Sequence, residues 1–92
     1  MIAAPNRPIT WREKLTEALA KNGEGWGEVE SSTLSEEQLN VQFDAGYGSV
    51  QGVPFTLWTE RRVYFPVSYD GSESVRSVSR HPDGQPTDHI AG

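Results

Sequence analysis

The stretch FTLWTERRVYFPVSYDGSESVRSVSR, residues 55–80, holds most of the aromatic and β-branched side chains of this chain. Residues 55–59 and 63–69 alternate with the period of two that is typical of half-buried strands. Residues 75–80 are a third, weaker candidate, and Asp70-Gly71 in front of them is a strong turn signal. The stretch therefore predicts three strands joined by two tight turns.

Pro66 lies inside the middle strand of this prediction, where a proline has no amide to donate to a neighbouring strand. We expect either a break or bulge near Pro66, or a first hairpin that pairs only to about residue 65. Val75 and Val78 pose a similar choice, because they either lie on opposite faces of the sheet or flank a bulge.

The residues before this stretch predict two helices. Thr10 and Glu13 form a capping box, and Asn22-Gly23 accepts the left-handed conformation of a helix end. A helix from about 10 to 22 is expected, with an apolar stripe made by Trp11, Leu15, Ala18 and Leu19. Ser35 and Gln38 form a second capping box, which predicts a short helix from 35 to about 43.

These elements predict one α+β domain over residues 1–92, with two helices packed on one face of a three- to four-stranded antiparallel sheet. The fourth strand is either an edge strand within 24–32 or a short strand within 50–54. Residues 1–9 are expected to form an extended arm and 81–92 an irregular tail, because both are rich in turn residues.

The composition narrows the classes of protein that remain. The chain has no cysteine, which excludes disulfides and thiolate chemistry. No apolar run approaches the roughly 18 residues that cross a bilayer, and the N-terminus lacks the apolar core of a secretory signal. A cytoplasmic location is the expectation from these features.

Charge is distributed unevenly along the chain. Residues 22–60 contain no lysine or arginine and carry a formal charge of −7, against −5 for the whole chain. This excess disfavours direct binding to nucleic acid and suits a partner protein with a basic surface. The alternative is that the carboxylates are simply solvated. The acidic residues predicted to bind such a partner are Glu24, Glu28, Glu30, Glu36, Glu37 and Asp44.

Signals for catalysis or for a cofactor are weak. His81, Asp83, Asp88 and His89 have the character of metal ligands, but their spacing matches no standard site. No serine lies in a nucleophile elbow, and the glycines of residues 23–27 have acidic neighbours that would repel a phosphate. We expect a non-enzymatic protein without a cofactor, and a small metal-binding protein or hydrolase using His81 and His89 is the alternative.

Trp58 and Tyr64 are predicted to share the sheet face opposite Phe55, Leu57 and Phe65. If helices cover only one face, these two aromatic side chains form an exposed patch that suits a protein interface. They are therefore added to the predicted partner-binding residues. A structural or homo-oligomeric protein that associates through this patch, for example a homodimer, is a further alternative.

Several short motifs resemble a family of short, functionally uncharacterised proteins of tailed phages and prophages. The resemblance rests on Trp11-Arg12-Glu13, Phe43-Asp44-Ala45-Gly46-Tyr47-Gly48, Pro54-Phe55-Thr56, Trp58-Thr59, Arg62-Val63-Tyr64-Phe65-Pro66-Val67, Tyr69-Asp70-Gly71 and Arg80-His81-Pro82. It implies a phage accessory protein and brings no assigned activity. By analogy with other small phage proteins, an inhibitor of host defence, such as an anti-CRISPR protein, is implied.

Overall fold

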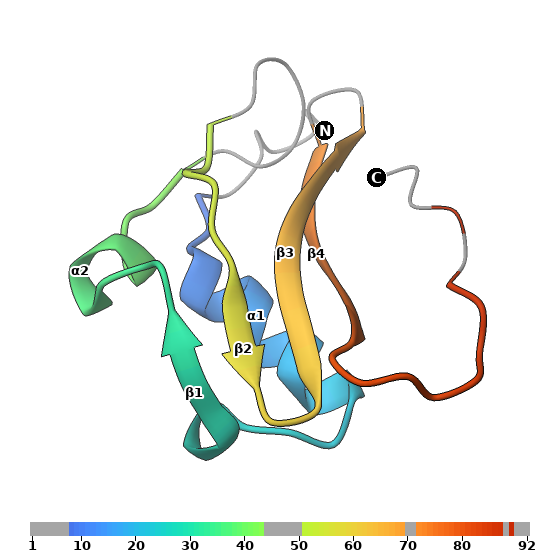
Figure 1. Cartoon of the computed structure of the whole chain (residues 1–92). Coiled ribbons are helices and arrows are strands. Elements are labelled where there is room, and N and C mark those ends of the chain that lie inside the picture. The colour runs from blue at the N-terminus through green and yellow to red at the C-terminus, as the bar shows by residue number, and fades with distance from the viewer. Residues whose placement is uncertain (1–7, 44–50, 70–71, 88, 90–92) are drawn as a thin grey trace.

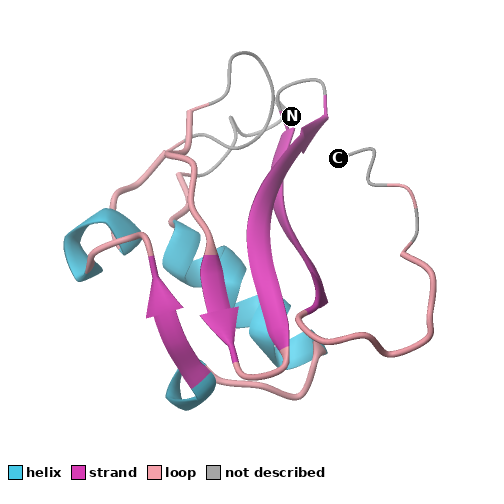
Figure 2. Ribbon diagram, in the orientation of Figure 1, coloured by secondary structure: helices cyan, strands magenta, loops and turns pink. Residues whose placement is uncertain are grey.

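A computed structural model describes residues 8–43, 51–69, 72–87 and 89. It shows an α+β domain in which helix α1 lies behind a four-stranded antiparallel sheet, as Figures 1 and 2 show. The predicted fold class is confirmed. The elements in chain order are α1 (Trp11–Lys21), the 3-10 helix η1 (Trp26–Glu28), β1 (Val29–Ser32), α2 (Glu36–Leu39), β2 (Leu57–Thr59), β3 (Arg62–Tyr69) and β4 (Ser72–Ser79).

The strands follow one another in space in the order β1-β2-β3-β4, so each is joined to its neighbour along the chain. Strand β1 is the predicted edge strand, and the alternative strand at 50–54 does not form over its described residues, 51–54. The pairing of β3 with β4 runs without a bulge, which places Val75 and Val78 on opposite faces. The predicted turn at Asp70-Gly71 lies outside the described residues.

Pro66 is accommodated because β2 is short. The backbone of β3 alternates between its two neighbours, and the Arg80 amide donating to the Arg61 carbonyl at 2.8 Å fixes which residues face β4. By this alternation Pro66 faces the β2 side, where the ladder ends at the pair Leu57–Tyr64. No bond is therefore lost, and the expectation that the first hairpin pairs only to about residue 65 is confirmed.

The predicted assignment of Tyr64 to the outer face is wrong. The two-residue turn at Glu60-Arg61 pairs Leu57 with Tyr64 and Trp58 with Val63, and directly paired residues share a face. Tyr64 therefore lies on the core face with Leu57 and is 0% exposed. The other face carries Trp58, Val63, Phe65, Val67 and Val78, all of which are half-buried.

Helix α1 forms as its sequence predicts. The Thr10 hydroxyl accepts the Glu13 amide at 3.1 Å, and Trp11, Leu15 and Leu19 are buried against the sheet. Gly23 ends the helix with φ of 70°, and the amides of Gly23 and Glu24 donate back to the Ala20 and Leu19 carbonyls. This ending turns the residue after Gly23 toward the core.

Helix α2 is one turn long, shorter than the predicted 35–43. The capping box is present, because the Ser35 hydroxyl accepts the Gln38 amide and the Gln38 side chain accepts the Ser35 amide. Asn40 ends the helix, and Leu39 is buried in the core. The end of the N-terminal arm is also ordered, because Ile9 forms an antiparallel bridge with Phe43.

A strap over residues 51–55 closes the core at the end of the sheet away from the Glu60-Arg61 turn. The Trp11 indole N–H donates to the Val53 carbonyl at 2.9 Å, and the ring centroids of Trp11 and Phe55 are 4.9 Å apart. Glu73 is 3% exposed, and its two carboxylate oxygens accept the amides of Gln51 and Gly52, each at 2.8 Å. Strand β4 thus holds the strap through one buried carboxylate.

We expect Gly52→Ala to lower the free energy of unfolding by about 2 kcal/mol. A Cβ at Gly52 would lie 2.7 Å from Cζ2 of Trp11 and 2.9 Å from Oε1 of Glu73, both closer than van der Waals contact allows. Urea denaturation of the two proteins measures the difference. Gly27→Ala is the matched control, because a Cβ at Gly27 meets no atom within 4 Å. Equal losses in the two variants would show that Trp11 and Glu73 do not crowd Gly52.

Candidate functional site

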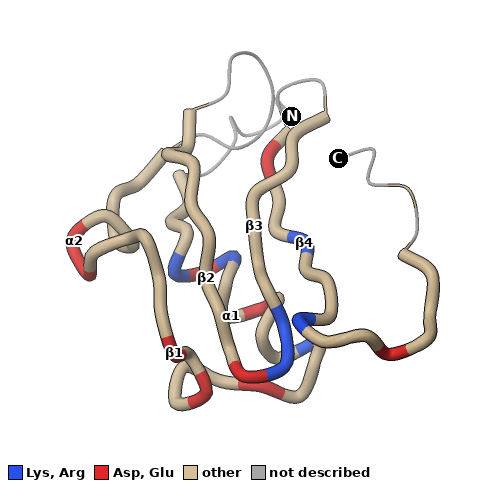
Figure 3. Tube along the Cα trace, viewed as in Figure 1, with Lys and Arg blue, Asp and Glu red and all other residues tan. Residues whose placement is uncertain are grey.

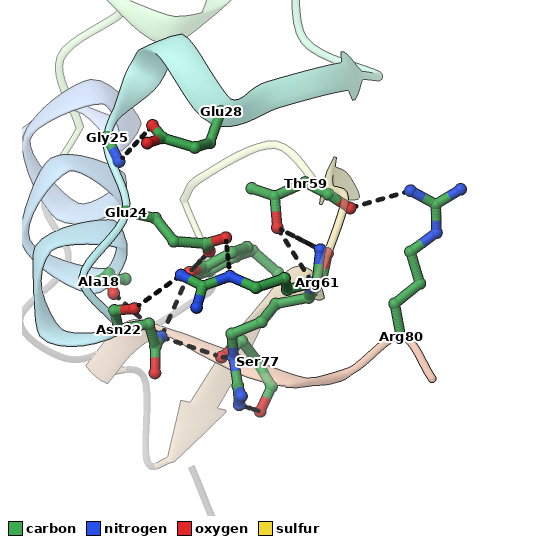
Figure 4. Close-up of polar contacts among 11 residues, drawn as sticks. Ala18, Asn22, Glu24, Gly25, Glu28, Thr59, Arg61, Ser77 and Arg80 are labelled. Atoms are coloured by element: carbon green, nitrogen blue, oxygen red, sulfur yellow. Dashed lines mark hydrogen bonds and ion pairs between the residues drawn. The ribbon is translucent and has the colours of Figure 1, made fainter. Parts of the chain in front are cut away.

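The buried polar group nearest to the predicted acidic surface is the carboxylate of Glu24. It follows Gly23 at the end of α1 and is 7% exposed. The Tyr64 hydroxyl donates to it at 2.5 Å, and Nε of Arg61 lies 3.4 Å from its other oxygen. Figure 4 shows Arg61 reaching from the β2–β3 turn over Glu24 toward Asn22. The Arg61 guanidinium donates a hydrogen bond to the Asn22 carbonyl at 3.2 Å. The group joins the end of α1 to the turn between two strands.

Opposing effects set the pKa values in this group. Burial raises the pKa of Glu24, but hydrogen bonds from Tyr64 and Thr59 and the charge of Arg61 outweigh it, so the pKa lies below its ordinary value. Burial, together with the hydrogen bond to Glu24, raises the pKa of Tyr64 to about 12. The pair therefore holds an ionised carboxylate against a neutral phenol at neutral pH.

Glu24 and Tyr64 are not available to a partner, and their prediction as surface residues is wrong. The sequence contained a signal that was missed. Gly23 is the left-handed residue of a helix ending whose next position packs back toward the helix. Glu24 occupies that position, and Tyr64 meets it because the Glu60-Arg61 turn sets the strand register.

Exposed carboxylates gather at one end of the sheet. Glu28, Glu30 and Glu60 line a shallow hollow of about 320 Å³ where η1 and β1 meet the β2–β3 turn. Figure 3 shows these acidic positions together at the lower end of β1 and β2. Glu28 accepts the Gly25 amide, and Glu30 accepts one bond from Arg80 at 2.7 Å. Glu60 has no hydrogen bond or ion pair with the residues that the structure describes.

The remaining predicted carboxylates lie elsewhere. Glu36 and Glu37 are exposed on α2, at the opposite end of β1. Arg12 pairs with Glu36 and also donates to the Asn40 side chain at 3.1 Å, which ties α2 to α1. Asp44 lies outside the described residues. The acidic residues therefore follow the β1 margin of the sheet in two groups, and two of their charges are partly offset by arginines.

Trp58 is half-buried on the sheet face that α1 does not cover, and Tyr64 lies on the opposite face. A row of apolar pairs crosses the strands there, because Trp58 pairs with Val63 and Val63 pairs with Val78. The uncovered face therefore differs from the predicted aromatic patch, because it lacks Tyr64 and is made of both aliphatic and aromatic side chains. Its residues are Trp58, Val63, Phe65, Val67 and Val78.

The two histidines of the tail are exposed, and neither makes a side-chain hydrogen bond within the described part of the chain. In that part, no group of three or more histidine, aspartate or glutamate side chains is arranged to hold a metal ion. Asp88 lies outside it. None of the described helices is long and apolar enough to cross a membrane.

Compared with models of known protein families, with curated proteins and with solved structures, the chain matches none. The functional reading therefore rests on the arrangement of its own residues.

Proposed function

We propose that this protein is a non-enzymatic binding protein whose acidic β1 margin docks on a basic surface of a partner protein. The observation that carries the proposal is the hollow lined by Glu28, Glu30 and Glu60, in which Arg61 is the only basic side chain among the described lining residues. Arg61 is directed to the buried Glu24, and Arg80 partly offsets Glu30, so Glu28 and Glu60 are the exposed carboxylates of the hollow without an ion pair to a described residue. Charges gathered in this way steer and orient a positively charged partner.

The specific form of the proposal is an accessory protein of a phage that inhibits host defence in the host cytoplasm. A basic groove that a defence complex uses to hold nucleic acid would be a suitable surface for the acidic margin. Support for this form comes from the resemblance of the sequence motifs and from the charge of the margin.

Reversing the charge of Glu60 should weaken capture of a basic partner by about tenfold at low salt, because an attraction becomes a repulsion. The immobilised protein is exposed to bacterial lysate, captured proteins are identified by mass spectrometry, and the purified partner is titrated against Glu60→Lys. Capture by the wild-type protein should also decrease as salt increases.

Glu17→Lys is the matched control for Glu60→Lys. Glu17 is exposed on α1 and has no hydrogen bond or ion pair to any described residue. Its substitution by lysine therefore changes the net charge by the same amount as Glu60→Lys and leaves the acidic margin intact. The double variant Glu30→Lys/Glu60→Lys should abolish capture, and the single variants Glu17→Lys and Glu60→Lys should keep the melting temperature of the wild type. Equal affinities of Glu17→Lys and Glu60→Lys would contradict the proposal.

Self-association is the second candidate, and the uncovered face with Trp58 favours it. Apolar side chains of this kind are common at interfaces between copies of a chain. Light scattering over a range of concentrations distinguishes the candidates. A concentration-dependent dimer that Trp58→Ser returns to a monomer would assign the face to a second copy.

A further inference from the structure

We infer that the free edge of β4 binds an extended acidic peptide as a fifth strand of the sheet. This inference goes beyond the proposed function, because it concerns the opposite edge of the sheet and a ligand of opposite charge. It rests on the backbone of β4, on a groove beside that strand, and on the charges that line the groove.

The backbone of β4 offers unpaired hydrogen-bonding groups. The bond from Arg80 to Arg61 and the regular register place the amides and carbonyls of Val75, Ser77 and Ser79 on the side away from β3. None of these three amides donates to a described residue. A row of free groups on an edge strand is a template for one more strand.

A groove of about 710 Å³ runs along this edge. One wall is the last part of β4, residues 76–79, and the other is the tail over residues 81–87. Figure 1 shows the tail leaving the end of β4 and returning beside it. The return is built by a turn in which Asp83 accepts the Gln85 amide and Gly84 has φ of 76°. The groove is therefore open to an extended chain along the unpaired edge.

The charges in the groove are mostly positive. Arg62, Arg76, Arg80 and His81 line it, and among the described residues that line it Asp83 is the only carboxylate. Arg80 is directed to Glu30 and to the Thr59 carbonyl, whereas Arg76 is exposed and has no described partner. Arg62 donates to the Ser77 carbonyl at 3.3 Å, which occupies one edge group while the groove is empty. A ligand with carboxylates on the face of the sheet that α1 does not cover would pair with Arg76.

A peptide fits this groove better than a nucleic acid does. No aromatic side chain of the described part of the chain lines the groove, so bases would have nothing there to stack on. A peptide, by contrast, supplies the amides and carbonyls that the edge lacks.

The test uses a synthetic peptide that alternates glutamate with valine, about eight residues long to match a strand. In an antiparallel addition, residues opposite Arg76 direct their own amides away from β4, so glutamates lie beside Arg76 while valine amides bond to the strand. Titration is followed by NMR of the full chain. We expect shifts and slowed hydrogen exchange at the amides of Val75, Ser77 and Ser79.

Two forms of the peptide have the same composition and test the geometry. Methylating the valine nitrogens should abolish binding, whereas methylating the glutamate nitrogens should leave it nearly unchanged. On the protein side, Arg76→Glu should weaken binding by about tenfold at low salt. Lys21→Glu is the matched control, because Lys21 is exposed at the end of α1 and without a described partner.

Four results of the binding measurements would overturn the inference. They are no binding of the peptide at about 1 mM, equal binding of the two methylated peptides, equal effects of Arg76→Glu and Lys21→Glu, and tighter binding of a single-stranded oligonucleotide at the same amides. Shifts of those amides with protein concentration alone would assign the edge to a second copy, which also contradicts it. The proposed function is tested at Glu60, so either proposal can fail without the other.

Discussion

Replacing Glu73 by alanine is expected to lower the free energy of unfolding by about 4 kcal/mol, since hydrogen bonds to a charged group contribute about 1.5–3 kcal/mol each. The carboxylate accepts two backbone amides in a site that is 3% exposed. Truncation would leave the amides of Gln51 and Gly52 without acceptors in the closed end of the core. Chemical denaturation of the wild type and the variant gives the difference directly.

Two further substitutions separate the lost acceptors from other causes. Glu73→Gln keeps one acceptor oxygen but places an amide group against the second backbone amide, so its loss should be intermediate. Ser72→Ala changes the exposed neighbour on the same strand and should be nearly neutral. If Glu73→Ala costs less than about 1 kcal/mol, water replaces the carboxylate and the strap is not held by β4.

Tyr64→Phe is expected to lower the free energy of unfolding by about 2–3 kcal/mol, because it removes the hydrogen bond to a buried charged group and leaves Glu24 less well solvated. The ring itself stays, so packing against Leu57 is preserved and the loss reports on the hydroxyl. Tyr69→Phe is the control, because Tyr69 is 64% exposed. Equal stabilities of the Tyr64→Phe and Tyr69→Phe variants would show that the hydroxyl contributes nothing.

The same pair predicts how stability depends on pH. The folded-state pKa of Tyr64 is raised to about 12, so its contribution is complete below about pH 10, the unfolded value, and is lost between about pH 10 and 12. The folded-state pKa of Glu24 is lowered from 4.5, so its contribution is present above the unfolded value and is lost as the pH falls below it. Tyr64→Phe should flatten the alkaline loss. An unchanged alkaline slope in that variant would contradict the raised pKa.

The two edges of the sheet differ in charge, and this difference organises both proposals. Glu28, Glu30 and the carboxylates of α2 lie along the β1 margin, whereas Arg76 lies on β4 and Arg62, from β3, lines the groove beside it. Figure 3 shows acidic positions on β1 and α2 at one side of the sheet and a basic position in β4 at the other. The two proposed ligands would therefore occupy opposite edges of the domain and would not compete for one site.

Local signals in the sequence determined the secondary structure, because each acts within a few residues. Thr10 and Gly23 bound α1, Ser35 with Gln38 starts α2, and the alternation over residues 55–69 places β2 and β3. Each of these signals either supplies hydrogen-bond partners for the backbone groups at a helix end or sets the period of apolar residues, and none depends on a contact with a distant part of the chain. The length of α2 was overestimated, because Asn40 ends it before the apolar pattern does.

The tertiary structure alone decided which residues are accessible. The alternation shows that Tyr64 and Phe65 lie on opposite faces, but only the cross-strand pairing with Leu57 turns Tyr64 inward. Glu24 is acidic in a run of acidic residues, yet the end of α1 and the phenol from β3 enclose it. Which carboxylates remain for a partner depends on contacts such as the one between Glu24 and Tyr64, which are 40 residues apart in the sequence. No local sequence pattern encodes a contact over that separation. The chain by itself therefore determined its helices, strands and charge, and the long-range packing determined which of those charges face outward.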